Sequence, residues 1–183
     1  MTAIWLVRHG EAAATWGEHE DPGLSELGKQ QAEAAAELLI EEIPDDIQLI
    51  SSPKARAIET AAPLSARLAA GVRVVDAFRE IQAPVALSER QEWLKGFMRE
   101  EWHRQPESLW GWRNNIISGL SALNRPTVIF THFLVINAVV AHIRQHPATV
   151  QLWPDNASHH QFVNGPHGLE IVALGRELTT RIN

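Results

Sequence analysis

Short apolar runs alternate with longer segments of helical pattern along this chain, and that alternation restricts its fold more than any other feature. Residues 3–8 form a continuous apolar run that ends in charge, as in a strand buried on both faces of a parallel sheet. Five further strands are predicted, the last two as a hairpin-like pair: 47–51, 72–78, 127–131, 160–163 and 169–174. Strands interleaved with helices predict an α/β sandwich with a mainly parallel central sheet.

Capping signals mark where the predicted helices begin. Ser25 can cap a helix that runs to about Glu42. Ser52-Pro53 predicts the start of a second helix, ending near Gly71, because a hydroxyl can cap it and proline suits the first helical position. The apolar stripe of the first helix is expected to consist of Leu27, Ala34, Leu38 and Leu39. Residues 81–124 are predicted to be mostly helical, and residues 134–144 to form a further helix.

Composition and charge exclude several classes of function. The chain has 183 residues, 45% of them apolar, and a formal net charge of −6 with no block of basic residues. Neither nucleic acid nor an anionic membrane is therefore an expected partner. The lack of cysteine excludes disulfides, thiolate catalysis and Cys-ligated zinc. No apolar run approaches the ~18 residues that cross a bilayer, so we expect one cytoplasmic domain over residues 1–183.

Chemistry-bearing side chains follow three of the predicted strands. In open α/β sheets, ligands bind beyond the carboxyl ends of the strands. Arg8-His9 end the first strand and Thr131-His132 the fourth, and Arg56 lies shortly after the second. Arginine offers a planar fork for phosphate oxygens, and neutral imidazole is a competent nucleophile near neutral pH. We therefore expect three distant stretches of sequence to meet at one edge of the sheet.

Five short motifs in a fixed order extend this pattern through most of the chain. They are RHGE (8–11), LSELGKQQA (24–32), SSPKARAIETA (51–61), FREI (78–81) and FTH (130–132). Each motif alone is weak, whereas the ordered combination is specific and touches roughly residues 4–140. The series resembles the histidine phosphatase (phosphoglycerate mutase-like) superfamily.

The resemblance implies a three-layer α/β/α sandwich of the phosphoglycerate mutase-like type and a phosphohistidine mechanism. In the family, the histidine of the Arg-His-Gly motif, here His9, takes a phosphoryl group from substrate and passes it to water or to a second substrate. Arg8, Arg56 and His132 match the positions that hold the phosphoryl oxygens, and Glu80 matches the proton donor. No metal or other cofactor is implied, and the chain has no glycine loop of the nucleotide-binding kinds.

Metal-independent hydrolysis of a small phosphorylated substrate is the activity we expect. The chain is shorter than typical mutases of the family and lacks room for their larger cap, although the segment of about 81–124 would form a cap-like part. A phosphoglycerate mutase-like phosphotransferase is the alternative enzyme, and a non-catalytic member that binds phosphorylated ligands is the alternative of another class. The resemblance does not choose among sugar phosphates, phospho-cofactors and phosphoproteins, and the sequence does not indicate an oligomeric state.

Two departures from the family pattern concern the walls of the pocket. Phe133 follows His132 where many members have glycine, which predicts a bulkier or shifted wall. Thr15 stands where an asparagine often occurs, and its hydroxyl is expected to donate a hydrogen bond to phosphate. Neither departure removes a group that phosphoryl transfer needs.

Histidines and tryptophans outside the motifs are interpreted mainly as structural. His142 and His146 lie four residues apart, but no glutamate lies between them as in zinc proteases, so metal ligation is not expected. The tryptophans of the 81–124 segment are spaced by nine, eight and two residues, which makes no helical stripe. Most are expected to pack over the sheet, and one or two to line the mouth of the pocket: Trp93, Trp102, Trp110 and Trp112.

Overall fold

A six-stranded sheet forms the centre of the computed structural model, which describes residues 1–14 and 19–179. Its strand order is β3-β2-β4-β1-β5-β6. Strands β1 to β4 run parallel, whereas β5 is antiparallel to both β1 and β6. The strands are β1 (Thr2–Arg8), β2 (Gln48–Ser51), β3 (Val72–Val74), β4 (Thr127–Thr131), β5 (His159–Gly165) and β6 (Gly168–Ala173). The predicted mainly parallel sheet and the terminal hairpin are confirmed.

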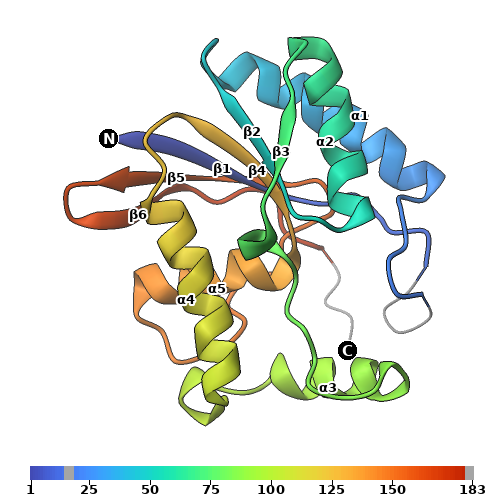
Figure 1. The fold of residues 1–183 in the computed structure, drawn as a ribbon, viewed down its shortest axis with the longest axis vertical. Helices are drawn as coiled ribbons and strands as arrows, with labels where there is room; N and C mark the ends of the chain where they lie inside the picture. Colours follow the sequence, from blue (N-terminus) through green and yellow to red (C-terminus); the bar gives the residue numbers. More distant parts are fainter. Residues whose placement is uncertain (15–18, 180–183) are drawn as a thin grey trace.

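Helices cover both faces of this sheet, which gives the predicted three-layer sandwich (Figure 1). Successive residues of β1 point to opposite faces: Trp5 and Val7 pack under the first two helices, and Ile4 and Leu6 under the last two. All four are buried, as expected of a central strand. The helices are α1 (Glu26–Glu42), α2 (Ala55–Leu68), α3 (Arg90–Phe97), α4 (Glu107–Ser121) and α5 (Phe133–Arg144).

Helix α1 begins where the sequence predicts, but it buries a different face. The Ser25 hydroxyl accepts a hydrogen bond from the Gly28 N–H at 3.0 Å, which confirms the cap. The predicted stripe is wrong except at Leu39, since Leu27 and Leu38 are 49% and 57% exposed and Ala34 is exposed too. Gly28 explains why: a Cβ there would lie 2.1 Å from the Glu11 carbonyl oxygen. This close approach places small side chains inward, and the helix buries Ala32, Ala35 and Ala36 beside Leu39.

The start of helix α2 is a second correction. Ser52 does not cap it, because the helix begins at Ala55 with Lys54 as its N-cap residue. The carboxylate of Asp21 accepts the Ala55 N–H at 3.0 Å and supplies the missing cap from a distant loop. The helix ends at Leu68, near the predicted point, with Ala69 in the left-handed conformation (φ 49°).

The region between α2 and β4 is less regular than predicted. Strand β3 stops at Val74, and a 3₁₀ turn, Asp76–Phe78, replaces the rest of the expected strand. The predicted helical stretch 81–124 holds α3 and α4 together with irregular chain and two further 3₁₀ turns, one just before α3 and one between the two helices. No helix within residues 1–14 and 19–179 is long and apolar enough to cross a membrane.

Candidate active site

Two histidines from neighbouring parallel strands face each other at the carboxyl edge of the sheet. His9 follows β1 and His132 follows β4, and their ring centroids lie 5.2 Å apart with an interplanar angle of 62°. Arg56, in the first turn of α2, donates from Nε to Nε2 of His9 at 3.1 Å. Sequence-distant residues therefore meet as expected from the strand ends. Thr15, which was predicted to donate a hydrogen bond to phosphate, lies outside the described residues.

Hydrogen bonds fix the tautomer of His9. Its Nδ1 lies 2.7 Å from the carbonyl oxygen of Gly10, which can only accept, so Nδ1 carries the proton. Nε2 is then the unprotonated nitrogen, consistent with its acceptance of the Arg56 N–H. Gly10 is required here, because a Cβ would lie 2.5 Å from the carbonyl oxygen of Gly28. The Gly10 N–H is held in turn by the Thr60 hydroxyl at 3.0 Å.

Burial and positive charge keep both imidazoles neutral. Burial, followed by the charges of Arg56 and Arg8, holds the pKa of His9 well below its usual value of 6.5. Burial and neighbouring positive charges have the same effect on the pKa of His132. Burial also lowers the pKa of Arg8 to about 10, which leaves that guanidinium charged at neutral pH. The site therefore holds two neutral imidazoles among fixed cations.

The carboxyl group of Glu80 is buried beside this cluster. Its oxygens accept the backbone N–H groups of Ile81, at 3.1 Å, and of Leu134, at 3.3 Å, in the first turn of α5. Burial raises the pKa of Glu80 above 4.5, although these two bonds and the charges of Arg56 and Arg8 oppose the shift. A buried carboxyl with a raised pKa can hold a proton for a leaving group.

Two side-chain bonds that the sequence did not predict position Glu80. The Thr131 hydroxyl donates to the carbonyl oxygen of Phe78 at 2.9 Å. The indole N–H of Trp112 donates to the carbonyl oxygen of Arg79, also at 2.9 Å. The two residues just before Glu80 are thus held by β4 and α4, the second of them through Trp112.

Ser52 contacts His132, although the sequence predicted it to cap a helix. Its hydroxyl lies 2.7 Å from Nε2 of His132, and it also accepts the Lys54 N–H at 3.3 Å. Nδ1 of His132 is buried and has no hydrogen-bond partner among the described residues. The serine therefore holds the ring by one nitrogen and leaves the other available to a ligand.

Arg8 is held from its far side. One terminal nitrogen donates to the carbonyl oxygen of Pro154 at 2.7 Å, and Nε is buried without a partner among the described residues. Its guanidinium carbon lies 5.3 Å from the centre of the Phe133 ring, within the range of a cation–π contact. The residue that departs from the family pattern thus packs against an arginine of the site.

Groups that could ligate a metal do not converge in the described part of the chain, where no cluster of three or more His, Asp or Glu is found. His159 and His160 point to opposite sides of β5: the first lies 3.1 Å from a carboxylate oxygen of Glu42, and the second bonds Ser158 and the Gly175 N–H. Each of the two rings therefore has its own partners on its own side of β5.

Comparisons with known proteins agree with this geometry. The family description "Histidine phosphatase superfamily (branch 1)" matches residues 4–176. No curated protein sequence matches significantly. The chain is similar to mycobacterial glucosyl-3-phosphoglycerate phosphatase with inorganic phosphate (23% identity, TM-score 0.72, 97% of this chain and 98% of that one).

Two other solved structures have the same fold. One is phosphoserine phosphatase from Entamoeba histolytica in complex with 3-phosphoglyceric acid (22% identity, TM-score 0.74, 96% of this chain and 98% of that one). The other is YhfR from Bacillus stearothermophilus (17% identity, TM-score 0.78, 94% of this chain and 96% of that one). The TM-scores and coverages establish the shared fold, and the family match spans nearly the whole sequence. The chain belongs to the histidine phosphatase superfamily, branch 1.

Proposed function

We propose that this protein hydrolyses phosphomonoesters through a phosphohistidine at His9, without a metal ion. The observation that carries the proposal is the unprotonated Nε2 of His9, fixed by the Nδ1 bond to Gly10 and bordered by Arg56. Neutral imidazole needs no further base to attack phosphorus. The family membership and the phosphatases among the solved neighbours support the same activity.

In the first step, Nε2 of His9 forms a bond to phosphorus while the ester P–O bond breaks. The transferring group spreads negative charge over three oxygens, and Arg8, Arg56 and His132 are placed to stabilise it. Substrate oxygens carry full negative charge, so they are better acceptors than the imidazole nitrogen that Arg56 contacts in this structure. The Arg56 guanidinium is thus freed from His9 as the nucleophile engages phosphorus.

Glu80 handles the proton in both steps. Its carboxyl donates a proton to the leaving alkoxide oxygen as the P–O bond breaks. The resulting carboxylate then takes a proton from the water that attacks phosphohistidine, and the N–P bond breaks. The enzyme returns to its starting state, with inorganic phosphate as product.

Positive charge continues outward from the nucleophile toward the segment 81–124, which we propose as the cap. Arg90, the first residue of α3, lowers the pKa of both Arg56 and Lys54 through its charge, although burial is the larger cause for each. Its Nε is buried without a partner among the described residues. These cations favour a small substrate with a second anionic group, such as a phosphorylated acid.

Arg90→Ala tests this substrate class. We expect kcat/KM for a phosphorylated carboxylic acid to fall about tenfold or more, since one charge-assisted hydrogen bond is worth roughly 1.5–3 kcal/mol. Hydrolysis of nitrophenyl phosphate, which has no second anion, should change little. Arg99→Ala is the matched control, because Arg99 is an exposed arginine of the same segment. Equal losses on both substrates would contradict the assignment.

The proposed mechanism is tested by rapid quenching with a ³²P-labelled phosphomonoester. We expect protein-bound label that is lost in acid and retained in alkali, as phosphohistidine requires. Turnover should persist after treatment with a metal chelator and release inorganic phosphate rather than an isomerised ester, which separates hydrolysis from mutase activity. Alkali-labile label, or turnover that needs added metal, would contradict the proposal.

A further inference from the structure

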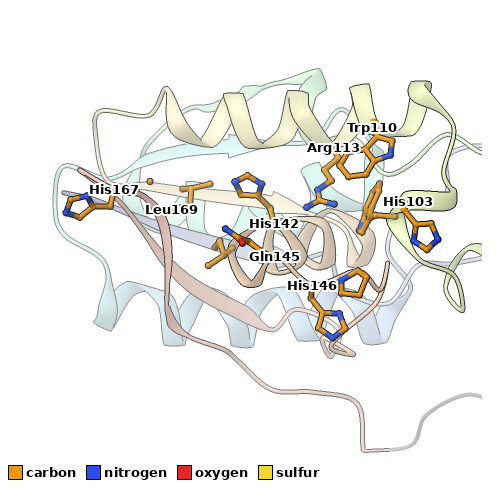
Figure 2. Close-up of a pocket in the computed structure, with 12 residues that line it drawn as sticks. His103, Trp110, Arg113, His142, Gln145, His146, His167 and Leu169 are labelled. Carbon is orange, nitrogen blue, oxygen red and sulfur yellow. The ribbon is translucent and has the colours of Figure 1, made fainter.

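A second pocket lies at the opposite end of helix α5 from the proposed active site. It is open, has a volume of about 530 Å³, and lies between α4, the last turn of α5 and the β5–β6 turn (Figure 2). His132 precedes the first turn of α5, whereas His142 and Gln145 line the pocket at its far end. Ten residues of helix separate His132 from His142, which is about 15 Å at 1.5 Å per residue. The pocket is therefore a separate site.

Arg113 of α4 is the unusual group in this pocket. Its side chain is only 7% exposed, yet it forms no hydrogen bond or ion pair with any residue in 1–14 or 19–179. Burial lowers its pKa, and no carboxylate offsets that effect. The nitrogens of the guanidinium are not among the buried unpartnered atoms of the described residues, so this partly desolvated charge faces the open pocket without a counter-charge, which favours an anion there. Figure 2 shows Arg113 reaching from α4 toward His142 and Gln145, into the space that the pocket encloses.

Two tryptophans form an aromatic wall around the guanidinium. Its carbon lies 4.6 Å from the ring centre of Trp102 and 4.9 Å from that of Trp110, which places it in cation–π contact with both. Such contacts hold the side chain in place without neutralising its charge. Trp102 is itself buried, whereas the partly exposed Trp110 offers apolar surface beside the charge, which suits a ligand with a ring or other apolar body.

The remaining polar groups of the pocket favour an anion. None of the lining residues in the described part of the chain is acidic. The Ala148 N–H donates to Nδ1 of His146 at 3.1 Å, so neutral His146 carries its proton on Nε2 and can donate it to a ligand. The carbonyls of Ala141 and His142 at the end of α5 accept the N–H groups of His146 and Gln145. These bonds occupy carbonyl oxygens that would otherwise repel a negative group.

We propose that this pocket binds a small anionic ligand, with a phosphate or carboxylate group on Arg113 and an apolar or ring-bearing body against Trp110. The site is distinct from the phosphoryl-transfer centre and does not depend on the activity proposed for it. A pocket of this volume accommodates a ligand of metabolite size.

The test is an NMR titration with phenylphosphonate, a phosphate-like anion with a ring that the enzyme cannot hydrolyse as an ester. We expect the indole N–H signals of Trp102 and Trp110 to shift saturably in the wild-type protein. Arg113→Met should weaken this response at least tenfold, because the charge-assisted contact is lost. Arg56→Met, which removes an arginine of the proposed active site, should leave it unchanged. Methylphosphonate, the matched probe without a ring, should bind more weakly.

A stability measurement separates this role from a purely structural one. An arginine that awaits an anion is uncompensated in anion-free buffer, so Arg113→Met should keep or raise the Tm. Hydrolysis by Arg113→Met should match the wild-type rate. The proposal is overturned if the two indole signals do not move at millimolar phenylphosphonate, or if they move equally in Arg113→Met. A marked fall of the Tm in that variant, with no wild-type response, would identify Arg113 as structural only.

Discussion

His9→Ala is expected to lower kcat for phosphomonoester hydrolysis by at least ~10⁴-fold, because it removes the atom that accepts the phosphoryl group. That factor corresponds to about 5.4 kcal/mol of transition-state stabilisation. The cations of the site would remain, since Arg8 is held by Pro154 independently of the histidine. Binding of inorganic phosphate should therefore survive in the variant while turnover and the labelled phosphoenzyme disappear. Steady-state kinetics, together with phosphate titration, measures the two effects separately.

Controls distinguish loss of the nucleophile from loss of the fold. His9→Gln keeps a side-chain N–H that can bond the Gly10 carbonyl, so it should match His9→Ala in inactivity and the wild type in unfolding temperature. His159→Ala removes a histidine of β5, the strand that pairs with β1. The side chain of His159 contacts Glu42, the last residue of α1. That variant should keep wild-type activity. Turnover within tenfold of wild type in His9→Ala would show that another group accepts the phosphoryl.

The parts of the site that the sequence predicted depend on local geometry. Arg8-His9 and His132 were placed by the rule that parallel strands end at one edge of a sheet, and the structure brings the two rings to 5.2 Å. Their assignment to phosphoryl transfer needed more, namely the order of five motifs along the chain. The cap at Ser25 was predictable because a hydroxyl and a near N–H belong to one short segment.

The wrong predictions concern segments in which a residue distant in sequence forms the hydrogen bond that a local pattern was expected to provide. The Ser52 hydroxyl suited a helix cap, but His132 is close enough to bond it, and Asp21 caps the helix instead. Strand β3 ends early because the chain turns so that the carbonyl of Phe78 meets the Thr131 hydroxyl. These hydrogen-bond partners are distant in sequence, so the local sequence around Ser52 or around β3 could not predict them.

For the tryptophans of the 81–124 segment, too, the sequence predicted the general role but not the individual contacts. Most of them were expected to pack over the sheet, and Trp102 is indeed buried, with Trp93, Trp110 and Trp112 packed against the same core. Their individual tasks were not predictable: one indole bonds the carbonyl before Glu80, and two others enclose a guanidinium. These contacts depend on which elements meet in the fold. The pocket around the guanidinium, for example, is lined by α4, α5 and the β5–β6 turn.

Glu80→Gln is expected to slow hydrolysis in proportion to how much the leaving group needs a proton. For an alkyl phosphate, loss of the general acid should reduce kcat by about 10²–10⁴-fold. For nitrophenyl phosphate, whose phenolate leaves without a proton, we expect a much smaller loss. The glutamine keeps a carbonyl oxygen to accept a backbone N–H, so the position of the segment is preserved. Glu107→Gln, at an exposed glutamate of α4, is the matched control.

The pH dependence of the wild-type enzyme should also report the protonation of Glu80. Glu80 must be protonated to act first, and its raised pKa keeps more of the acid form than an ordinary carboxyl has at the same pH. The alkyl phosphate rate should therefore fall as pH rises through that pKa. His9 must be neutral, and its lowered pKa moves inactivation by protonation well below pH 6.5. In Glu80→Gln the alkaline fall should disappear while the acid limb remains. An unchanged alkaline limb, or equal losses on both substrates, would assign the proton to another group.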